Sequence, residues 1–262
     1  MTGEKPAKSL RAAVEDGDLA AVARMLARKK PDLADSGGFM GMTLLHVAAD
    51  EGHAEIAALL CAAGAPLNLP CEGYHWTPLH YAATCGHALV VEVLIAAGAD
   101  IEVRDGCRET PLHAAAHAGE APVVEKLLAA GAKIEARDKF GRTPLALAIE
   151  MPLNTAAARK LVAAGASLSA TDDAGNTLLH AAARRKSAAM AGYLIANGRC
   201  GDALSTNEAW ESPISLWPKI MGLPEWTVLQ EARKKELDME AIKEALARVR
   251  RLGSLRPKSP TM

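Results

Sequence analysis

Five segments of the chain share one pattern of apolar and polar positions, and successive copies begin 33 or 34 residues apart. Each copy has a leucine two residues after its first threonine and apolar residues, mostly alanine, five and six residues after it. These positions lie on one face of an α-helix, so the pattern predicts a helix that buries this face. A second apolar stretch in each copy predicts a second helix. The copies begin at Thr43, Thr77, Thr110, Thr143 and Thr177.

Residues that start and stop helices stand at fixed places in the repeat. Threonine is a good N-cap, and the proline that follows it in three copies loses no hydrogen bond at the first helical position. Glycines that can end a helix in a left-handed turn stand in the middle and at the end of the copies. These are Gly52, Gly86 and Gly119, and then Gly64, Gly98, Gly131, Gly165 and Gly198. Each repeat is therefore predicted to be a helix, a turn, a helix and a projecting hairpin finger, and it must stack on neighbours to bury its apolar faces.

The motif Thr-Pro-Leu-His, followed by paired alanines, is complete in the copies at Thr77 and Thr110. Gly-His pairs (Gly52-His53, Gly86-His87) and Gly-Ala pairs (Gly64-Ala65, Gly98-Ala99, Gly131-Ala132, Gly165-Ala166) accompany it. Over roughly residues 8–200 the chain resembles the ankyrin repeat family. The resemblance implies an all-α fold with β-hairpin fingers, in which helix-turn-helix-hairpin units stack in one curved solenoid.

The repeat pattern also predicts the organisation of the chain. The repeat that begins at Thr143 departs from the motif: Ala146 replaces the histidine, Ile149 an alanine and Pro152 the turn glycine. We therefore expect this repeat to unfold locally more readily than its neighbours. The predicted parts are a flexible lead at 1–7; ankyrin repeats over 8–211, with an N-terminal cap at 8–42 and repeats at 43–76, 77–109, 110–142, 143–176 and 177–211; a degenerate repeat with a C-terminal capping helix at 212–252; and a disordered basic tail at 253–262.

Composition supports closely packed helices and excludes several classes of protein. Alanine supplies about a fifth of the 262 residues, against two Phe, four Trp and three Tyr. A net charge of −1 lacks the basic bias of a nucleic-acid binder, and no apolar run approaches the roughly 18 residues of a membrane span. The start of the chain has no apolar core for a signal peptide, and the five cysteines have no paired spacing. We therefore expect reduced thiols and a cytoplasmic protein.

No motif predicts catalysis, a metal or a cofactor. The resemblance implies that the motif histidines His46, His80, His113 and His180 bond to backbone near the fingers. His75 and Cys107 occupy nearly equivalent places on adjacent fingers, but zinc would need two more ligands at fixed spacing. The sequence has no GxSxG elbow, P-loop or GxGxxG. We expect no enzyme and no metal or cofactor site.

The finger tips carry the candidate binding residues. The resemblance implies that partners contact the fingers and the exposed side of the first helix, and five of the nine aromatic residues fall at predicted finger tips. Aromatic residues outside the core are typical of interfaces; alternatively, Trp76 and Phe140 fold onto the neighbouring finger as local cores. The inner face is acidic in the first repeat and basic in the late ones. The predicted partner-binding residues are Phe39, Met40, Met42, Asp50, Glu51, Tyr74 and Trp76, with Phe140, Arg142 and Arg184 as a second patch.

These observations favour a non-catalytic protein–protein interaction module, an adaptor or scaffold that binds a protein through its finger tips and concave face. One alternative is a dedicated inhibitor or immunity-type protein that occludes a single enzyme or toxin. A further alternative is an accessory factor or enzyme that uses residues 200–262. We expect a monomer that binds neither nucleic acid nor membrane. The sequence does not identify the partner.

Overall fold

The computed structural model describes residues 9–28, 33, 39–150, 155–185, 187–194, 197, 205–209 and 211–216. Internal contacts divide the chain into two units. Unit 1 comprises Met1–Lys139, Thr143–Ala148 and Ala156–Ala166, and unit 2 comprises Phe140–Arg142, Ile149–Thr155 and Ser167–Met262. The predicted lead at 1–7, the segment 217–252 of the degenerate repeat and capping helix, and the tail at 253–262 lie outside the described residues.

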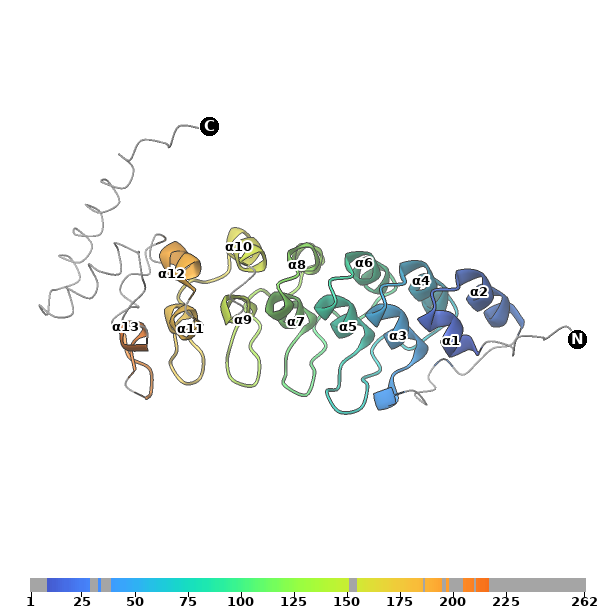
Figure 1. Cartoon of the computed structure of the whole chain (residues 1–262), viewed down its shortest axis with the longest axis horizontal. Helices are drawn as coiled ribbons and strands as arrows, with labels where there is room; N and C mark the ends of the chain where they lie inside the picture. Colours follow the sequence, from blue (N-terminus) through green and yellow to red (C-terminus); the bar gives the residue numbers. More distant parts are fainter. Residues whose placement is uncertain are drawn as a thin grey trace, which may run out of the picture. The chain divides into compact units, whose positions relative to one another are not determined.

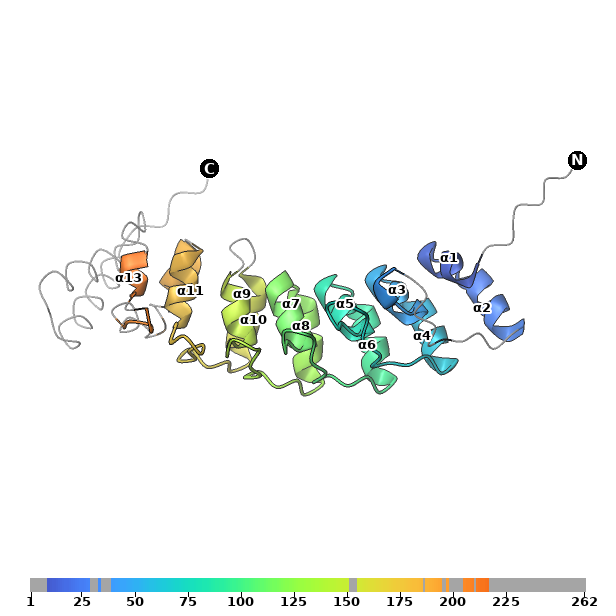
Figure 2. The same ribbon diagram turned by 90° about the horizontal axis from the view of Figure 1, so that it is seen from below.

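Unit 1 is built from pairs of short helices in two rows. Figure 1 shows α1, α3, α5 and α7 in one row, α2, α4, α6 and α8 in a second row, and the fingers projecting beyond the first row. From below, in Figure 2, the loops after α4 and α6 run along one edge of the unit. The helices are α1 (Leu10–Glu15), α2 (Leu19–Arg28), α3 (Leu44–Asp50), α4 (Ala54–Ala62), α5 (Pro78–Thr84), α6 (Ala88–Ala96), α7 (Pro111–Ala118), α8 (Ala121–Ala129) and α10 (Ala156–Ala163), with a 3₁₀ turn η1 (Phe39–Gly41).

The predicted helix caps are present. Thr43, Thr77 and Thr110 are the N-caps of α3, α5 and α7, and each forms a capping box with the histidine three residues later. Gly52 has a φ of 77° and ends the turn after α3, where the His87 ring leaves no room for a Cβ. Its positive φ and this close approach both require glycine. Ser9 is the N-cap of α1, and its hydroxyl accepts a hydrogen bond from the Ala12 N–H at 3.1 Å.

The motif histidines His46 and His80 fasten their helices to the next finger. In the first described copy, Nδ1 of His46 accepts the Thr43 N–H at 3.1 Å, so the ring proton lies on Nε2, which donates to the Trp76 carbonyl at 3.1 Å. His80 repeats this bond to the Glu109 carbonyl. His46 and His80 are fully buried. Burial disfavours the charged form, so it lowers the pKa of His46 from 6.5 to about 4 and also lowers the pKa of His80. Both rings are therefore neutral near pH 7. The structural role predicted for the motif histidines is confirmed at these positions.

Main-chain bonds link successive fingers in register. The N–H of Glu72 donates to the Met40 carbonyl at 2.8 Å, and the N–H of Gly106 donates to the Tyr74 carbonyl at 3.0 Å. Within the described residues the fingers are closed by turns rather than strands, and Thr171 and Thr177 form an isolated β-bridge. The predicted β-hairpins are therefore reduced to turns. The Cys71 N–H donates to the Trp76 carbonyl at 2.8 Å and closes the second finger, whereas the Glu72 N–H bonds to the neighbouring finger.

Unit 2 continues the same local design. It contains α11 (Leu178–Arg184), α12 (Ala188–Leu194) and α13 (Pro213–Leu216), and α9 (Pro144–Glu150) ends in it. Thr177 and His180 form the capping box of α11, and Nε2 of His180 donates to the Glu211 carbonyl at 3.1 Å. α13 contacts α11 and follows the buried Ser212. A further helix thus begins where the sequence predicts a degenerate repeat.

Candidate functional site

Two methionines, Met40 and Met42, are the described apolar side chains of the predicted patch on the first finger. Met40 has a φ of 55° and Met42 is half-buried beside it. The terminal methyl of Met40 lies near Gly73 of the next finger. Phe39 lies in η1, and its side chain is outside the described part of the structure. Met40 and the second finger therefore lie side by side, as the predicted patch requires.

Three aromatic rings meet between the second finger and α5. The Trp76 ring contacts Tyr81 edge-on, with centroids 5.2 Å apart and planes at 79°, and Tyr74 at 5.7 Å. Tyr81 in turn stands at 90° to the His46 ring. Edge-to-face pairs of this kind are favourable because the positive ring edge meets the negative ring face. Tyr74 remains 63% exposed, whereas Trp76 is half-buried.

The Trp76 indole is also tied to the third finger. Its Nε1 donates to Oδ2 of Asp105 at 3.0 Å. Oδ1 of the same carboxylate accepts the N–H groups of Cys107 and Glu109 at 2.8 Å each and closes the third finger. Trp76 therefore forms a local core between fingers, which was the alternative to an exposed anchor, while Tyr74 keeps the exposure expected of an anchor.

The predicted acids Asp50 and Glu51 lie at the end of α3, beside the end of α5. The Cys85 thiol donates to Oδ1 of Asp50 at 3.3 Å. The Glu120 carboxylate approaches from the N-cap of α8 and lies against Gly86. Burial, the hydrogen bond to Asp50 and the charges of Asp50, Glu120 and Glu51 together raise the pKa of Cys85 to about 11. Three carboxylates thus surround a thiol that stays protonated.

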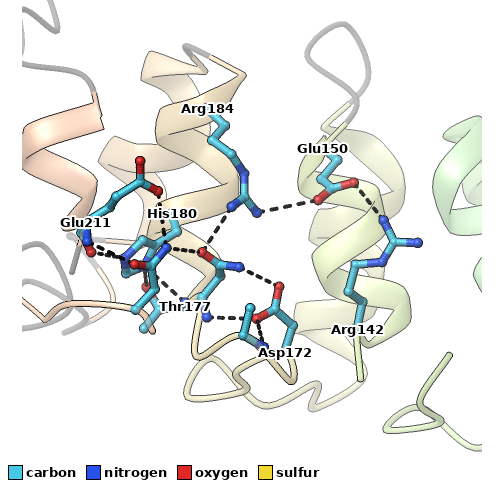
Figure 3. Close-up of polar contacts among 10 residues, drawn as sticks. Arg142, Glu150, Asp172, Thr177, His180, Arg184 and Glu211 are labelled. Carbon is cyan, nitrogen blue, oxygen red and sulfur yellow. Dashed lines mark hydrogen bonds and ion pairs between the residues drawn. The ribbon is translucent and has the colours of Figure 1, made fainter. Parts of the chain in front are cut away.

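The second predicted patch lies in unit 2 and has its own counter-charge. The Arg142 guanidinium is 4.9 Å from the Phe140 ring centroid and 3.3 Å from Oε2 of Glu150. Arg184 reaches Oε1 of the same Glu150 at 3.8 Å, as Figure 3 shows. Phe140 stays 51% exposed. Arg142 and Arg184 both contact Glu150, so the inner face that the sequence predicts to be basic in the late repeats is partly neutralised at this point.

A polar network continues from Arg184 into the fingers of unit 2 (Figure 3). Oδ1 of Asn176 accepts from Arg184 at 3.0 Å and from Nδ2 of Asn207 at 2.9 Å. Nδ2 of Asn176 donates to Asp172 at 2.8 Å. Asn207 also accepts the Glu211 N–H at 2.9 Å. Both ends of the Asn176 amide are therefore used, and two successive fingers are joined by side chains.

Sequence reasoning missed several of these residues. Tyr81 stands at a motif position where the other copies have Val47, Ala114, Leu147 and Ala181, so an aromatic residue there was a usable signal. Asp105, Asp138, Asp172 and Asn207 recur at the repeat period and mark the finger turns. The pairing of Glu150 with two arginines had no comparable signal.

Comparison with known proteins agrees with the geometry. A family described as ankyrin repeats in three copies matches residues 10–105, 91–172 and 112–207, which together span more than half of the chain. The chain belongs to the ankyrin repeat family. Its fold is the all-α ankyrin-repeat solenoid that the resemblance implied. Domains of this family generally mediate protein–protein interaction and are typically non-catalytic.

A solved structure gives the same result. The chain is similar to the crystal structure of the human ASB11 ankyrin repeat domain, with 26% sequence identity and a TM-score of 0.74. The match covers 87% of this chain and 98% of that one. No curated protein matches the chain. In the described part of the ankyrin array, no helix is both long and apolar enough to cross a bilayer.

Proposed function

We propose that this chain is a non-catalytic adaptor or scaffold that binds a protein partner through its finger tips and the exposed ends of its first-row helices. The observation that carries the proposal is where exposed apolar side chains lie. In the described residues, three large hydrophobic side chains are exposed: Tyr74, Leu89 and Phe140. Two of them, Tyr74 and Phe140, lie at finger tips. Exposed aromatic rings on ordered turns are typical of interfaces.

The proposed contact residues fall into two groups. The first group extends from the first two fingers to the end of α3, and the second lies in unit 2. Tyr74 is the proposed anchor of the first group, with Trp76 as its support. Phe140, with Arg142 stacked against it, is the proposed anchor of the second. The groups are Phe39, Met40, Met42, Asp50, Glu51, Tyr74 and Trp76, and then Phe140, Arg142 and Arg184.

Site-specific photo-crosslinking tests this role in the native cell. A photoreactive phenylalanine analogue is placed at position 74 in one variant and at position 89 in another. Leu89 is the matched control, since it is 68% exposed but lies on α6 in the second row. We expect position 74 to label one protein or a few, and position 89 to label none of them. Equal labelling from both positions, or none from position 74, would contradict the proposal.

The identified partner then allows a quantitative test. Tyr74→Ser should weaken binding by about 2 kcal/mol, and Leu89→Ser should leave affinity unchanged. Several partners of moderate affinity would support an adaptor, whereas one very tight partner would favour an inhibitor.

We also propose that the protein is cytoplasmic and monomeric. The four described cysteines are free thiols, which supports a reducing compartment. Light scattering of the full chain tests the monomer by measuring its mass.

A further inference from the structure

Aromatic and polar side chains follow one another along one helix of unit 1. The series begins at Tyr74 on the finger, continues through the Trp76 and Tyr81 rings, and ends at Cys85. Tyr81 and Cys85 are one helical turn apart, and the Cys85 N–H donates to the Tyr81 carbonyl at 2.9 Å. We call these four residues the α5 strip. It is apolar and exposed at the finger end and polar at the other.

The polar end of the α5 strip is anionic. Asp50, Glu51 and Glu120 surround Cys85, and in the described part of the chain none of the three forms an ion pair with a cation. One oxygen of Asp50 accepts the Cys85 thiol, which leaves Oδ2 available. The side-chain oxygen of Thr84, one residue before Cys85, is buried and has no partner in the described structure. Among the described residues, the three carboxylates at this end therefore have no cationic partner, and the Thr84 hydroxyl has no hydrogen-bond partner.

The neighbouring groups respond to this negative charge. Burial raises the pKa of both Tyr81 and Cys85, the Cys71 thiol raises that of Tyr81, and the Asp50 carboxylate adds to the rise in both. Both side chains therefore stay neutral and add no further negative charge. The anionic groups at this end of the strip are therefore the carboxylates alone.

On the basis of the binding role proposed above, we propose that the α5 strip binds a linear segment of the partner protein that carries arginine or lysine. The cationic group of that segment meets Asp50, Glu51 and Glu120. Its aliphatic stem, or an adjoining apolar residue, lies over the exposed part of Trp76 and Tyr74. An interaction of this kind combines charge pairing at one end of the strip with apolar contact to the aromatic rings at the other.

Charge complementarity selects this occupant over two others. An acidic segment, or nucleic acid, would bring like charge to three carboxylates that lack a counter-ion. A purely apolar segment would cover these carboxylates without pairing them, and burial of an unpaired charge is strongly unfavourable. A cationic segment avoids both penalties, and long-range attraction increases its rate of association.

A random peptide library displayed on phage and selected on the full-length chain tests this assignment. We expect selected peptides to be enriched in arginine and lysine, next to aromatic or aliphatic residues. One selected peptide, synthesised with a fluorophore, is then titrated with protein variants by fluorescence anisotropy. Asp50→Asn combined with Glu51→Gln should weaken binding by about tenfold or more, and raising salt from about 50 to about 300 mM should also weaken it.

The matched control removes the same number of charges elsewhere in unit 1. Glu55 lies on α4 and Asp100 lies in the loop after α6, and both are exposed. Glu55→Gln combined with Asp100→Asn should leave the affinity unchanged. This control separates a local pairing from a general effect of net charge.

The outcomes distinguish this assignment from the adaptor role itself. Peptides that lose affinity with Tyr74→Ser but carry no excess of cations, or bind the acid variant equally well, overturn the cationic partner and leave the adaptor role intact. A library that yields no peptide, or only acidic ones, also overturns the linear cationic segment. A native partner that crosslinks no better from position 74 than from position 89 contradicts the adaptor role as well.

Discussion

Trp76 and Asp105 join two neighbouring fingers through a hydrogen bond of 3.0 Å between the indole Nε1 and the carboxylate Oδ2. The other oxygen of Asp105 accepts two N–H groups of its own finger. One carboxylate thus closes the third finger and fixes the ring of the second. A tryptophan that looks like an exposed anchor in the sequence is also part of the structure that holds the fingers apart at a set distance.

Substitution of Trp76 should therefore affect stability as well as binding. Trp76→Phe removes the N–H but keeps most of the ring, and should lower the free energy of unfolding by about 1 kcal/mol. Trp76→Ala also removes the contact with Tyr81 and should lower it by about 2–3 kcal/mol. Urea unfolding of both variants measures the difference. A Trp76→Ala protein as stable as the wild type would mean that the ring contributes only to binding.

Stability should also depend on position in the array. Leu112 is fully buried on α7, between repeats, whereas Leu10 is half-buried at the start of α1. Leu112→Ala should lower the free energy of unfolding by about 2–5 kcal/mol, as other buried leucine truncations do. Leu10→Ala should have a smaller effect, because solvent already reaches one side of that residue. Urea unfolding of the two variants measures the difference. An equal loss in the free energy of unfolding for both would contradict a linear stack of repeats.

Much of the local fold could be predicted from the sequence because it is built from short-range signals. The capping box of Thr43 and His46 spans three residues, and the turn at Gly52 needs one glycine. Both signals repeat at the same period, so each copy supports the others. That His46 bonds to backbone near a finger also followed from the family resemblance, although its acceptor, the Trp76 carbonyl, is thirty residues away.

The contacts of the candidate site could not be predicted in the same way. The bond between Trp76 and Asp105 joins side chains from different fingers, and although aspartate recurs at the Asp105 position, tryptophan does not recur at the Trp76 position. The sequence predicted no partner for Glu150, yet it lies between Arg142 and Arg184. Such pairs depend on side-chain length and rotamer after the helices have stacked. The repeat period gives the neighbourhood of a residue but not its partner.

The two arginines around Glu150 should differ in how strongly they couple to it. The contact with Arg142 is 3.3 Å between side chains that are mostly shielded from solvent, whereas that with Arg184 is 3.8 Å and more exposed. Double-mutant cycles with Glu150→Gln, Arg142→Gln and Arg184→Gln give the coupling free energies from urea unfolding. We expect about 1 kcal/mol for Arg142 and less than about 0.5 kcal/mol for Arg184. A stronger coupling to Arg184 would contradict the geometry.

The repeat that begins at Thr143 should open more readily than its neighbours. Ala146 has no ring to fasten a finger, and Pro152 stands where Gly86 and Gly119 end the turns of other copies. Residues 151–154 lie outside the described structure. We expect amide protons over 150–156 to exchange faster than those at the turns of Gly86 and Gly119. Hydrogen exchange followed by mass spectrometry measures this, and uniform protection of the three turns would show that the substitutions are compensated.

Acid should weaken the array through its buried motif histidines. Burial lowers the pKa of folded His46 from 6.5 to about 4, so as the pH falls below 6.5 the unfolded chain takes up a proton before the folded one does. The stabilisation is fully present above about pH 6.5 and declines until about pH 4, by roughly 3 kcal/mol for this one residue. His46→Gln keeps a side chain suited to the capping box but removes the titration. The free energy of urea unfolding, measured at several pH values between 7 and 4, should therefore fall more steeply for the wild type than for His46→Gln. All other titrating groups are common to the two proteins, so parallel curves would show that His46 is not held neutral by burial.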